Sequence, residues 1–285
     1  MINRIALYRE RYYRIIAGKE SLMRLLDEAE VPEHVFNSNA IENSTLTLEE
    51  TEKILNQVAL DRYITEREIF EARNLARVIG YISGKATEKD IDVEMMLLLH
   101  KMMMANINTE IAGRFRQPGE YVRVGTHIAP APERIMELIT GMLYEYKAVY
   151  DSTTIIKRLS RLHLTFENIH PFVDGNGRMG RVIINYILVR EGYVPVNIKF
   201  VDRQRYYEAF SEFDRNEKTE IMEEILYKAL TNSYHKRLAY LEGREIITLG
   251  EYSKRMKISH SNLLNKAKRQ TIEAFLEKGI WKIGI

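Results

Sequence analysis

Residues 169–181 read IHPFVDGNGRMGR, and this segment decides the fold. Before it, residues 155–169 repeat apolar side chains at helical spacing, and residues 182–189 form a second apolar helical pattern after it. We therefore expect a tight loop between two buried helices, with the glycines of the segment opening the second helix.

The segment also concentrates groups that suit a polyphosphate. Successive N–H groups at 175–177 can form a concave anion site, and the following helix N-terminus adds free donors. Arg178 and Arg181 are three residues apart, so both can lie on one helical face and extend this site. Asp174 is placed to hold Mg²⁺ against the phosphates. His170 is the one nearby group whose ordinary pKa lies near neutrality, as a general base requires.

Other interpretations of this segment are weaker. Gly-Asn-Gly alone is typical of an ordinary turn. An EF-hand is excluded because, with Gly177 at its invariant glycine, Phe172 and Ile183 fall at the first and last ligand positions. No Gly-x-x-x-x-Gly-Lys-Ser/Thr sequence occurs, which excludes a P-loop. A functional site is favoured because a structural turn needs neither the histidine nor the two arginines.

The segment resembles the signature of the Fic family, His-x-Phe-x-Asp/Glu-Gly-Asn-Gly-Arg-x-x-Arg, at every specified position. The resemblance implies a mainly helical bundle with a β-hairpin flap, and Mg²⁺-dependent transfer of AMP from ATP to a Ser, Thr or Tyr hydroxyl of a protein. A related branch that transfers phosphate has Lys in place of the second glycine, so Gly177 favours nucleotidyl transfer. The implied roles are base for His170, metal ligand for Asp174, phosphate cradle for Gly175, Asn176 and Gly177, and binding of the β- and γ-phosphates for Arg178 and Arg181.

Composition sets broader limits. The chain has 285 residues, a formal net charge of +2 and no cysteine, so neither disulfides nor thiolate metal sites are available. Its N-terminal residues are too charged for a signal peptide, and no apolar run approaches the ~20 residues of a membrane span. We expect a cytoplasmic protein without membrane contact.

The N-terminal region, residues 1–60, carries a second motif. Residues 3–28 are predicted to form two amphipathic helices broken near Gly18, and Pro32 to start a short helix that includes residues 38–43. Ser38 and Glu42 match Ser/Thr-x-x-x-Glu-Gly/Asn, which resembles the inhibitory motif of autoinhibited Fic proteins, within segment 32–43. The resemblance implies that Glu42 pairs with Arg181 and blocks productive seating of the γ-phosphate. In some relatives the same glutamate supports removal of AMP.

The central region, residues 61–235, is predicted to be the catalytic core. Helices are expected over 65–84, 91–105, 133–149 and 155–169, preceded by a capping box at Thr47–Glu50. A methionine cluster at 102–104 and His163 are interpreted as core packing.

Two features of this core depend on the resemblance for their roles. Residues 113–132 alternate like a hairpin with Pro118-Gly119 as the turn. By resemblance this is the target-binding flap, with Thr126 and His127 expected to touch the target protein. Tyr207 and Asn185 are expected to contact adenosine.

The last part of the chain, residues 236–285, resembles small winged helix-turn-helix modules of excisionase-like proteins. From residue 246 onward there are eight Lys and Arg against three Asp and Glu. Lys266, Lys268 and Arg269 would lie on or after a recognition helix and could meet DNA phosphates. A module used for protein contacts explains the pattern equally well.

The main hypothesis is an autoinhibited protein adenylyltransferase that binds ATP and Mg²⁺ and modifies a protein substrate. This substrate could be the protein itself. The alternative is a DNA-associated regulator whose core removes AMP or modifies itself, and a third class is a non-catalytic nucleotide-binding switch. The intact His170 argues against that third class. The sequence does not identify the target protein. It does not define the oligomeric state either, and a homodimer is one possibility.

Overall fold

The computed structural model describes residues 2–125, 127–148 and 154–285. In this part of the chain the fold is mainly α-helical with two small antiparallel sheets, as predicted. The elements are α1 Ile2–Ile16, α2 Glu20–Ile41, α3 Leu48–Leu55, α4 Glu66–Lys85, α5 Val93–Met103, β1 Arg123–Val124, β2 His127–Ile128, the 3₁₀ turn η1 Pro132–Arg134, α6 Ile135–Ala148, α7 Ile155–Ile169, α8 Asn176–Arg190, the 3₁₀ turn η2 Phe200–Asp202, α9 Arg203–Asn216, α10 Glu220–Leu241, β3 Ile246–Thr248, α11 Leu249–Met256, α12 His260–Lys268, β4 Ala274–Glu277 and β5 Ile280–Gly284.

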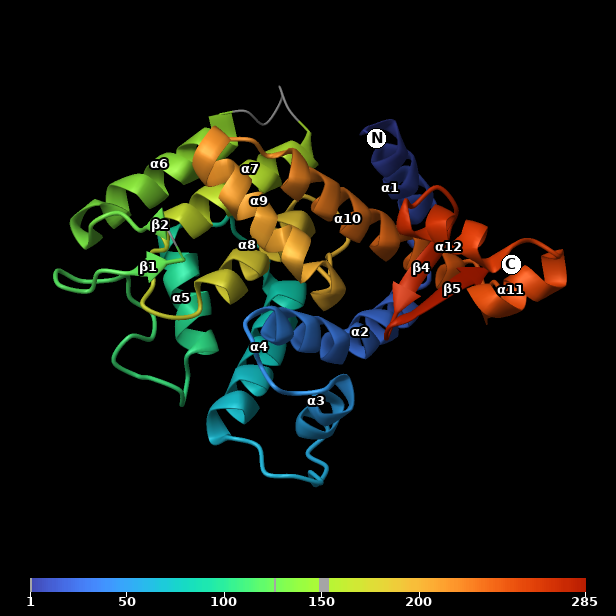
Figure 1. Cartoon of the computed structure of the whole chain (residues 1–285), viewed down its shortest axis with the longest axis horizontal. Helices are drawn as coiled ribbons and strands as arrows, with labels where there is room; N and C mark the ends of the chain where they lie inside the picture. The colour runs from blue at the N-terminus through green and yellow to red at the C-terminus, as the bar shows by residue number, and fades with distance from the viewer. Residues whose placement is uncertain (1, 126, 149–153) are drawn as a thin grey trace.

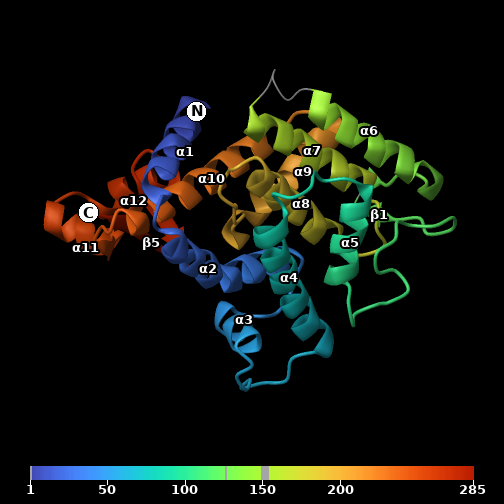
Figure 2. The ribbon, with the colours of Figure 1, turned by 180° about the vertical axis from the view of Figure 1, so that it is seen from behind.

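Helix α8 lies in the middle of the molecule, packed against α2, α4, α5 and α7 (Figure 1). It is buried on almost every side, which explains why its sequence is apolar beyond a single helical stripe. The hairpin β1–β2 and the C-terminal elements lie at opposite ends of the molecule, and α2 leads from the C-terminal end to α4 and α8 (Figure 2). This arrangement brings the C-terminus of α2, which carries Ser38, to the N-terminus of α8.

Several local predictions are confirmed. Helix α7 spans Ile155–Ile169, and Thr47 and Glu50 form the predicted capping box at the start of α3. Met103 and Met104 are fully buried, so the methionine cluster fills the core. None of the described helices combines the length and apolar character that crossing a bilayer would require.

Two local predictions are wrong. Pro32 does not start a helix, because α2 continues through it from Glu20 to Ile41. An internal proline costs ~3 kcal/mol, and buried contacts of α2 on both sides of Pro32 offset that cost. The hairpin does not turn at Pro118-Gly119 either. Its strands pair Arg123 with Ile128 and Val124 with His127, so the connection begins at Gly125.

The C-terminal elements form a three-stranded antiparallel sheet in the order β3-β5-β4, with α11 and α12 inserted between β3 and β4. They have a small apolar cluster of their own, whose buried members are Ile247, Leu249, Ala267, Ala274 and Ile283. β4 also packs on α10, so this segment is attached to the helical core. Its likeness to winged helix-turn-helix modules and the division of the chain at residues 60 and 235 stay predictions.

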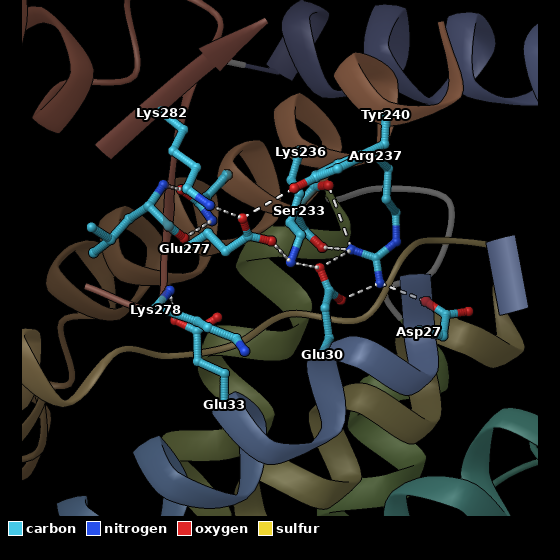
Figure 3. Close-up of polar contacts among 12 residues, drawn as sticks. Asp27, Glu30, Glu33, Ser233, Lys236, Arg237, Tyr240, Glu277, Lys278 and Lys282 are labelled. Atoms are coloured by element: carbon cyan, nitrogen blue, oxygen red, sulfur yellow. Dashed lines mark hydrogen bonds and ion pairs between the residues drawn. The ribbon is translucent and has the colours of Figure 1, made fainter. Parts of the chain in front are cut away.

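A network of buried charges joins α2 to α10 and to the β4–β5 turn (Figure 3). The guanidinium of Arg237 is fully buried and donates to Asp27 at 2.7 Å and to Glu30 at 2.6 Å. Lys236 bridges Glu30, at 3.2 Å, and Glu277. Because each buried charge has an opposite partner, the network fixes the position of α2 relative to α10 and β4.

Candidate active site

The loop between α7 and α8 is shaped by two residues with left-handed backbone angles. His170 ends α7 with φ +48°, and Gly175 precedes α8 with φ +81°. The side chain of Asn176 closes the loop, since its Oδ1 accepts from the N–H of Phe172 at 2.9 Å and its Nδ2 donates to the same residue's carbonyl at 2.8 Å. Asn176 is buried, and its side chain holds the loop together. The sequence predicted a phosphate contact for this residue but not this structural role.

His100 on α5 supports the loop through a hydrogen bond to Asp174 and a ring contact with Phe172. Its Nδ1 accepts from the N–H of Gly113 at 3.0 Å, so Nε2 carries the proton and donates to the carbonyl of Asp174 at 3.1 Å. Its ring is stacked on Phe172 with centroids 3.8 Å apart. Burial lowers the pKa of His100 to about 4, which keeps the imidazole neutral.

His170 stands at the end of α7 with a neutral side chain. Burial lowers the pKa of His170 to about 4, so the imidazole can accept a proton at neutral pH. Arg116 fixes its backbone: the guanidinium donates to the carbonyls of His170 at 2.8 Å and Ile169 at 3.3 Å. Arg116 itself is buried, and its N–H donates to the carbonyl of Pro171. Sequence reasoning missed this arginine.

Asp174 is surrounded by donors and cations. Its Oδ1 accepts from the N–H of Gly175 at 2.6 Å, and its other oxygen accepts from Arg67 of α4. Burial alone would raise the pKa of Asp174, but Arg178 and Arg67 outweigh that effect and hold the pKa below its usual range. Asp174 is therefore ionised and able to bind a cation.

The chemistry of the site fits a metal that arrives with phosphates. Among the described residues there is no group of three His, Cys, Asp or Glu side chains that could hold an ion alone. Mg²⁺, however, is commonly held by one carboxylate together with waters and substrate phosphates. Asp174 supplies such a carboxylate beside the N-terminus of α8, whose N–H groups suit phosphates.

Arg181 is buried and its donors are occupied by two elements. Its Nε donates to the hydroxyl of Ser38 at 2.9 Å and its Nη2 to the carbonyl of the same residue at 2.7 Å. Its Nη1 donates to Glu42 Oε1 at 2.9 Å and to the hydroxyl of Tyr206 at 3.2 Å. The contact between Glu42 and Arg181 that the sequence led us to expect is thus present.

Glu42 also approaches the backbone at the start of α8. A Cβ atom placed on Gly177 would lie 2.1 Å from Glu42 Oε1, so a larger residue at 177 would displace this carboxylate from its position. The N-terminus of a helix favours a negative charge. Glu42 therefore lies with its carboxylate where an anionic group of a ligand would meet the Gly177 backbone and Arg181.

The other predicted ligand residues have partners within the chain. The Tyr207 hydroxyl donates to the carbonyl of Ile41 at 2.9 Å, at the end of α2. Asn185 donates to and accepts from the backbone of Val196, at 3.0 and 2.7 Å. A cavity of about 40 Å³ beside Asn185 is far smaller than the ~300–1,000 Å³ of ligand sites. Asn185 thus holds the 194–198 segment, and its contact with adenosine stays a prediction.

Two predicted residues belong to the hairpin. His127 is held by the core, since its ring nitrogens lie 2.9 Å from Asp214 Oδ1 and 2.8 Å from the carbonyl of Asn168. It anchors the hairpin and is partly exposed, and its contact with a target protein stays a prediction. Thr126 lies outside the described residues. His163, as expected, is buried in the core, with Nε2 2.7 Å from the hydroxyl of Tyr206.

The model of the Fic/DOC family matches residues 90–188, which include the loop and both helices that flank it. The chain carries a Fic domain. The chain is 31% identical over 212 residues to "Protein adenylyltransferase Fic" of Nematostella vectensis, and this match covers 73% of the chain and 49% of the relative. A protein of the same name from Drosophila melanogaster is 34% identical over 179 residues, covering 61% of the chain and 36% of the relative. The chain with its Fic domain thus spans half the length of these relatives or less.

Solved structures support the fold around the Fic domain. A Fic domain containing signalling protein from Bacteroides thetaiotaomicron superposes with a TM-score of 0.75 at 21% identity, covering 85% of this chain and 97% of that one. A Fic family protein from Desulfovibrio desulfuricans has a TM-score of 0.65 at 21% identity and covers 100% of this chain and 97% of that one. The second match extends over the C-terminal elements as well.

Proposed function

We propose that this protein is a protein adenylyltransferase that transfers AMP from ATP to a Ser, Thr or Tyr hydroxyl of a protein, and that it is held inactive by Glu42. The observation that carries the proposal is the position of the Glu42 carboxylate, 2.9 Å from Arg181 and against the Gly177 backbone. The relatives' name supports the reaction class.

In the proposed reaction, His170 accepts the proton of the target hydroxyl. The oxygen of that hydroxyl then forms a bond to the α-phosphorus, and the bond from this phosphorus to the β-bridging oxygen breaks, so that pyrophosphate leaves. The Gly177 backbone, Arg178 and Arg181 bind the phosphates and stabilise their charge. Mg²⁺, when held at Asp174, would neutralise further phosphate charge.

The same arrangement supports the inhibitory role of Glu42. A carboxylate and the γ-phosphate compete for one guanidinium, and a sheltered carboxylate–guanidinium pair is strong. Arg181 is buried, so its partner is weakly screened by water. A nucleotide bound while Glu42 stays in place would lack the cation that orients its γ-phosphate.

The reaction class is tested with ATP labelled at either the α- or the γ-phosphate. Glu42→Gly and the double variant Glu42→Gly/His170→Ala are incubated with Mg²⁺, labelled ATP and a mixed proteome. The proposal predicts protein-bound α-label with Glu42→Gly and none with the double variant. Protein-bound γ-label above the level seen with the double variant would mean phosphotransfer by this protein and would overturn the proposal.

One surface favours a second candidate function, a DNA-associated regulator. Lys266, Lys268 and Arg269 are exposed at the end of α12, where they can reach phosphates. Replacing all three with Gln should then abolish salt-dependent binding to duplex DNA. Equal binding by the wild type and the triple variant would exclude this function for α12.

A further inference from the structure

The first two turns of α4 pack against the active-site loop through two side chains that the proposed reaction does not use. Arg67 donates to Asp174 and, at 3.0 Å, to Glu71. Glu71 lies 3.1 Å from Arg178, and Arg178 lies 3.5 Å from Asp174. These four side chains, which we call the α4 ring, alternate in charge and close on themselves.

Within the α4 ring, Glu71 is the partner that Arg178 needs. The side chain of Arg178 is only 4% exposed, and a buried guanidinium without a counter-charge is costly. Its Nη1 lies 3.1 Å from Glu71 and its Nη2 lies 3.5 Å from Asp174, so these two carboxylates neutralise its charge. Arg178 is therefore held in place beside the loop by the carboxylates of Glu71 and Asp174.

Arg67 differs from Glu71 in its surroundings. Its side chain is 56% exposed and reaches over the loop, where it donates to the same carboxylate that is proposed to hold Mg²⁺. A flexible, exposed arginine can swing away from this contact at little cost. A divalent cation at Asp174 would repel the Arg67 guanidinium, so the two compete for this carboxylate.

The same turn of α4 also contacts the chain just after Glu42. Glu68, the neighbour of Arg67, accepts from the N–H of Thr45 at 2.8 Å and from its hydroxyl at 2.9 Å. The start of α4 is thus attached both to Thr45, which follows the inhibitory segment, and, through Arg67, to Asp174. The resting site holds a carboxylate, Glu42, at the phosphate position and a guanidinium, Arg67, at the cation position.

We propose that Arg67 is a displaceable cation that occupies Asp174 until a divalent metal arrives with the nucleotide, and that Glu71 is a positioning residue for Arg178. The inference rests on the proposed function of the site and assigns to α4 control of its metal requirement. Arg67 therefore weakens binding of the metal, whereas Glu71 strengthens binding of the nucleotide phosphates.

The test measures binding rather than turnover. Mn²⁺ is titrated, with paramagnetic resonance as readout, into full-length Glu42→Gly protein that holds the non-hydrolysable β,γ-imido analogue of ATP. Arg67→Gln is added in this background, Arg67→Lys is the conservative variant, and Arg73→Gln, an exposed arginine on the same helix, is the control. Thermal melting checks that each variant is folded.

Arg67→Gln is expected to lower the Mn²⁺ concentration for half-saturation by roughly two- to fivefold, because an exposed ion pair no longer competes. Arg67→Lys should shift it less, and Arg73→Gln not at all. Glu71→Gln is expected to weaken binding of the analogue by roughly three- to tenfold, with partial recovery in Glu71→Asp.

Two outcomes overturn the inference. If the Glu42→Gly parent binds Mn²⁺ with the analogue and Arg67→Gln leaves the midpoint unchanged or raises it, the inference fails while the proposed function stands. If no folded variant binds Mn²⁺ with the analogue, both the inference and the proposed function fail.

Discussion

The carboxylate of Glu42, the residue that follows α2, lies directly against the backbone of Gly177 in the first turn of α8. A Cβ atom at 177 would lie 2.1 Å from Oε1 of Glu42, a distance that no pair of these atoms can adopt. Gly177→Ala should therefore lower the free energy of unfolding of the wild type by ~1–3 kcal/mol, as overpacking does. In the Glu42→Gly background the same change should cost much less, which urea unfolding of the four proteins measures. Equal losses in both backgrounds would show that Glu42 is not the group in contact.

Ser38 shares the task of holding Arg181. Ser38→Ala removes the acceptor 2.9 Å from Nε, while the carbonyl at 38 still accepts from Nη2. A hydrogen bond to a charged group is worth ~1.5–3 kcal/mol, so α-label incorporation should rise about tenfold or more, yet less than with Glu42→Gly. Ser83→Ala on α4 is the control, and a rate no higher than that of the control would refute this role.

The pH dependence of the reaction follows from His170. Burial lowers its pKa to about 4, so the imidazole stays neutral, and able to accept a proton, down to that pH. Activity of Glu42→Gly should therefore persist as the pH falls from 8 to 6 and be lost only as it approaches ~4–5. The measurement is kcat/KM against pH. An acidic limb near the ordinary histidine pKa of ~6.5 would contradict the burial of this base.

Buried histidines should also control stability. The pKa values of His34 and His163 are lowered by burial to about 3, and those of His100 and His170 to about 4. As the pH falls below ~6.5, the unfolded chain binds protons that the folded chain does not, and each histidine removes up to ~1.4 kcal/mol per pH unit. Glu167, whose pKa burial raises to about 8, acts in the opposite direction with a single proton. Because four histidines outweigh one glutamate, urea unfolding should show lower stability at pH 5 than at pH 7. Equal stability at the two pH values would contradict the lowered pKa values of these histidines.

The buried network of Figure 3 should be more important for folding than any surface pair. Arg237→Met leaves Asp27 and Glu30 without their guanidinium and should cost ~3–5 kcal/mol. Arg205→Met removes exposed pairs with Glu208 and Glu224 and should cost less than ~1 kcal/mol. Chemical unfolding compares the two, and similar losses would show that the network contributes no more than surface charge.

The sequence predicted the loop well because its information is local. The specified side chains from His170 to Arg181 lie within twelve residues, and the apolar patterns on both sides define α7 and α8. The pairing of Glu42 with Arg181 joins positions 139 residues apart, and only the resemblance of a short motif to a known family pointed to it.

The remaining parts of the site had no local signal. His100, Arg116, Arg67 and Glu71 reach the loop from distant elements, and in the sequence each is an ordinary residue of its own segment. The wrong prediction that a helix starts at Pro32 arose differently, because here the sequence did contain a local signal. A sound local rule was overruled by tertiary contacts of α2 that sequence periodicity does not reveal.

The most direct test of the account is the initial rate of α-label transfer by the wild type and by Glu42→Gly, at saturating Mg²⁺ and ATP. Glu28→Gly, the same change at an exposed position of α2, is the matched control. If Glu42 occupies the phosphate position, Glu42→Gly should transfer label at least tenfold faster than the wild type, and Glu28→Gly should not. Equal, high rates in the wild type and Glu42→Gly would contradict the inhibitory role of Glu42.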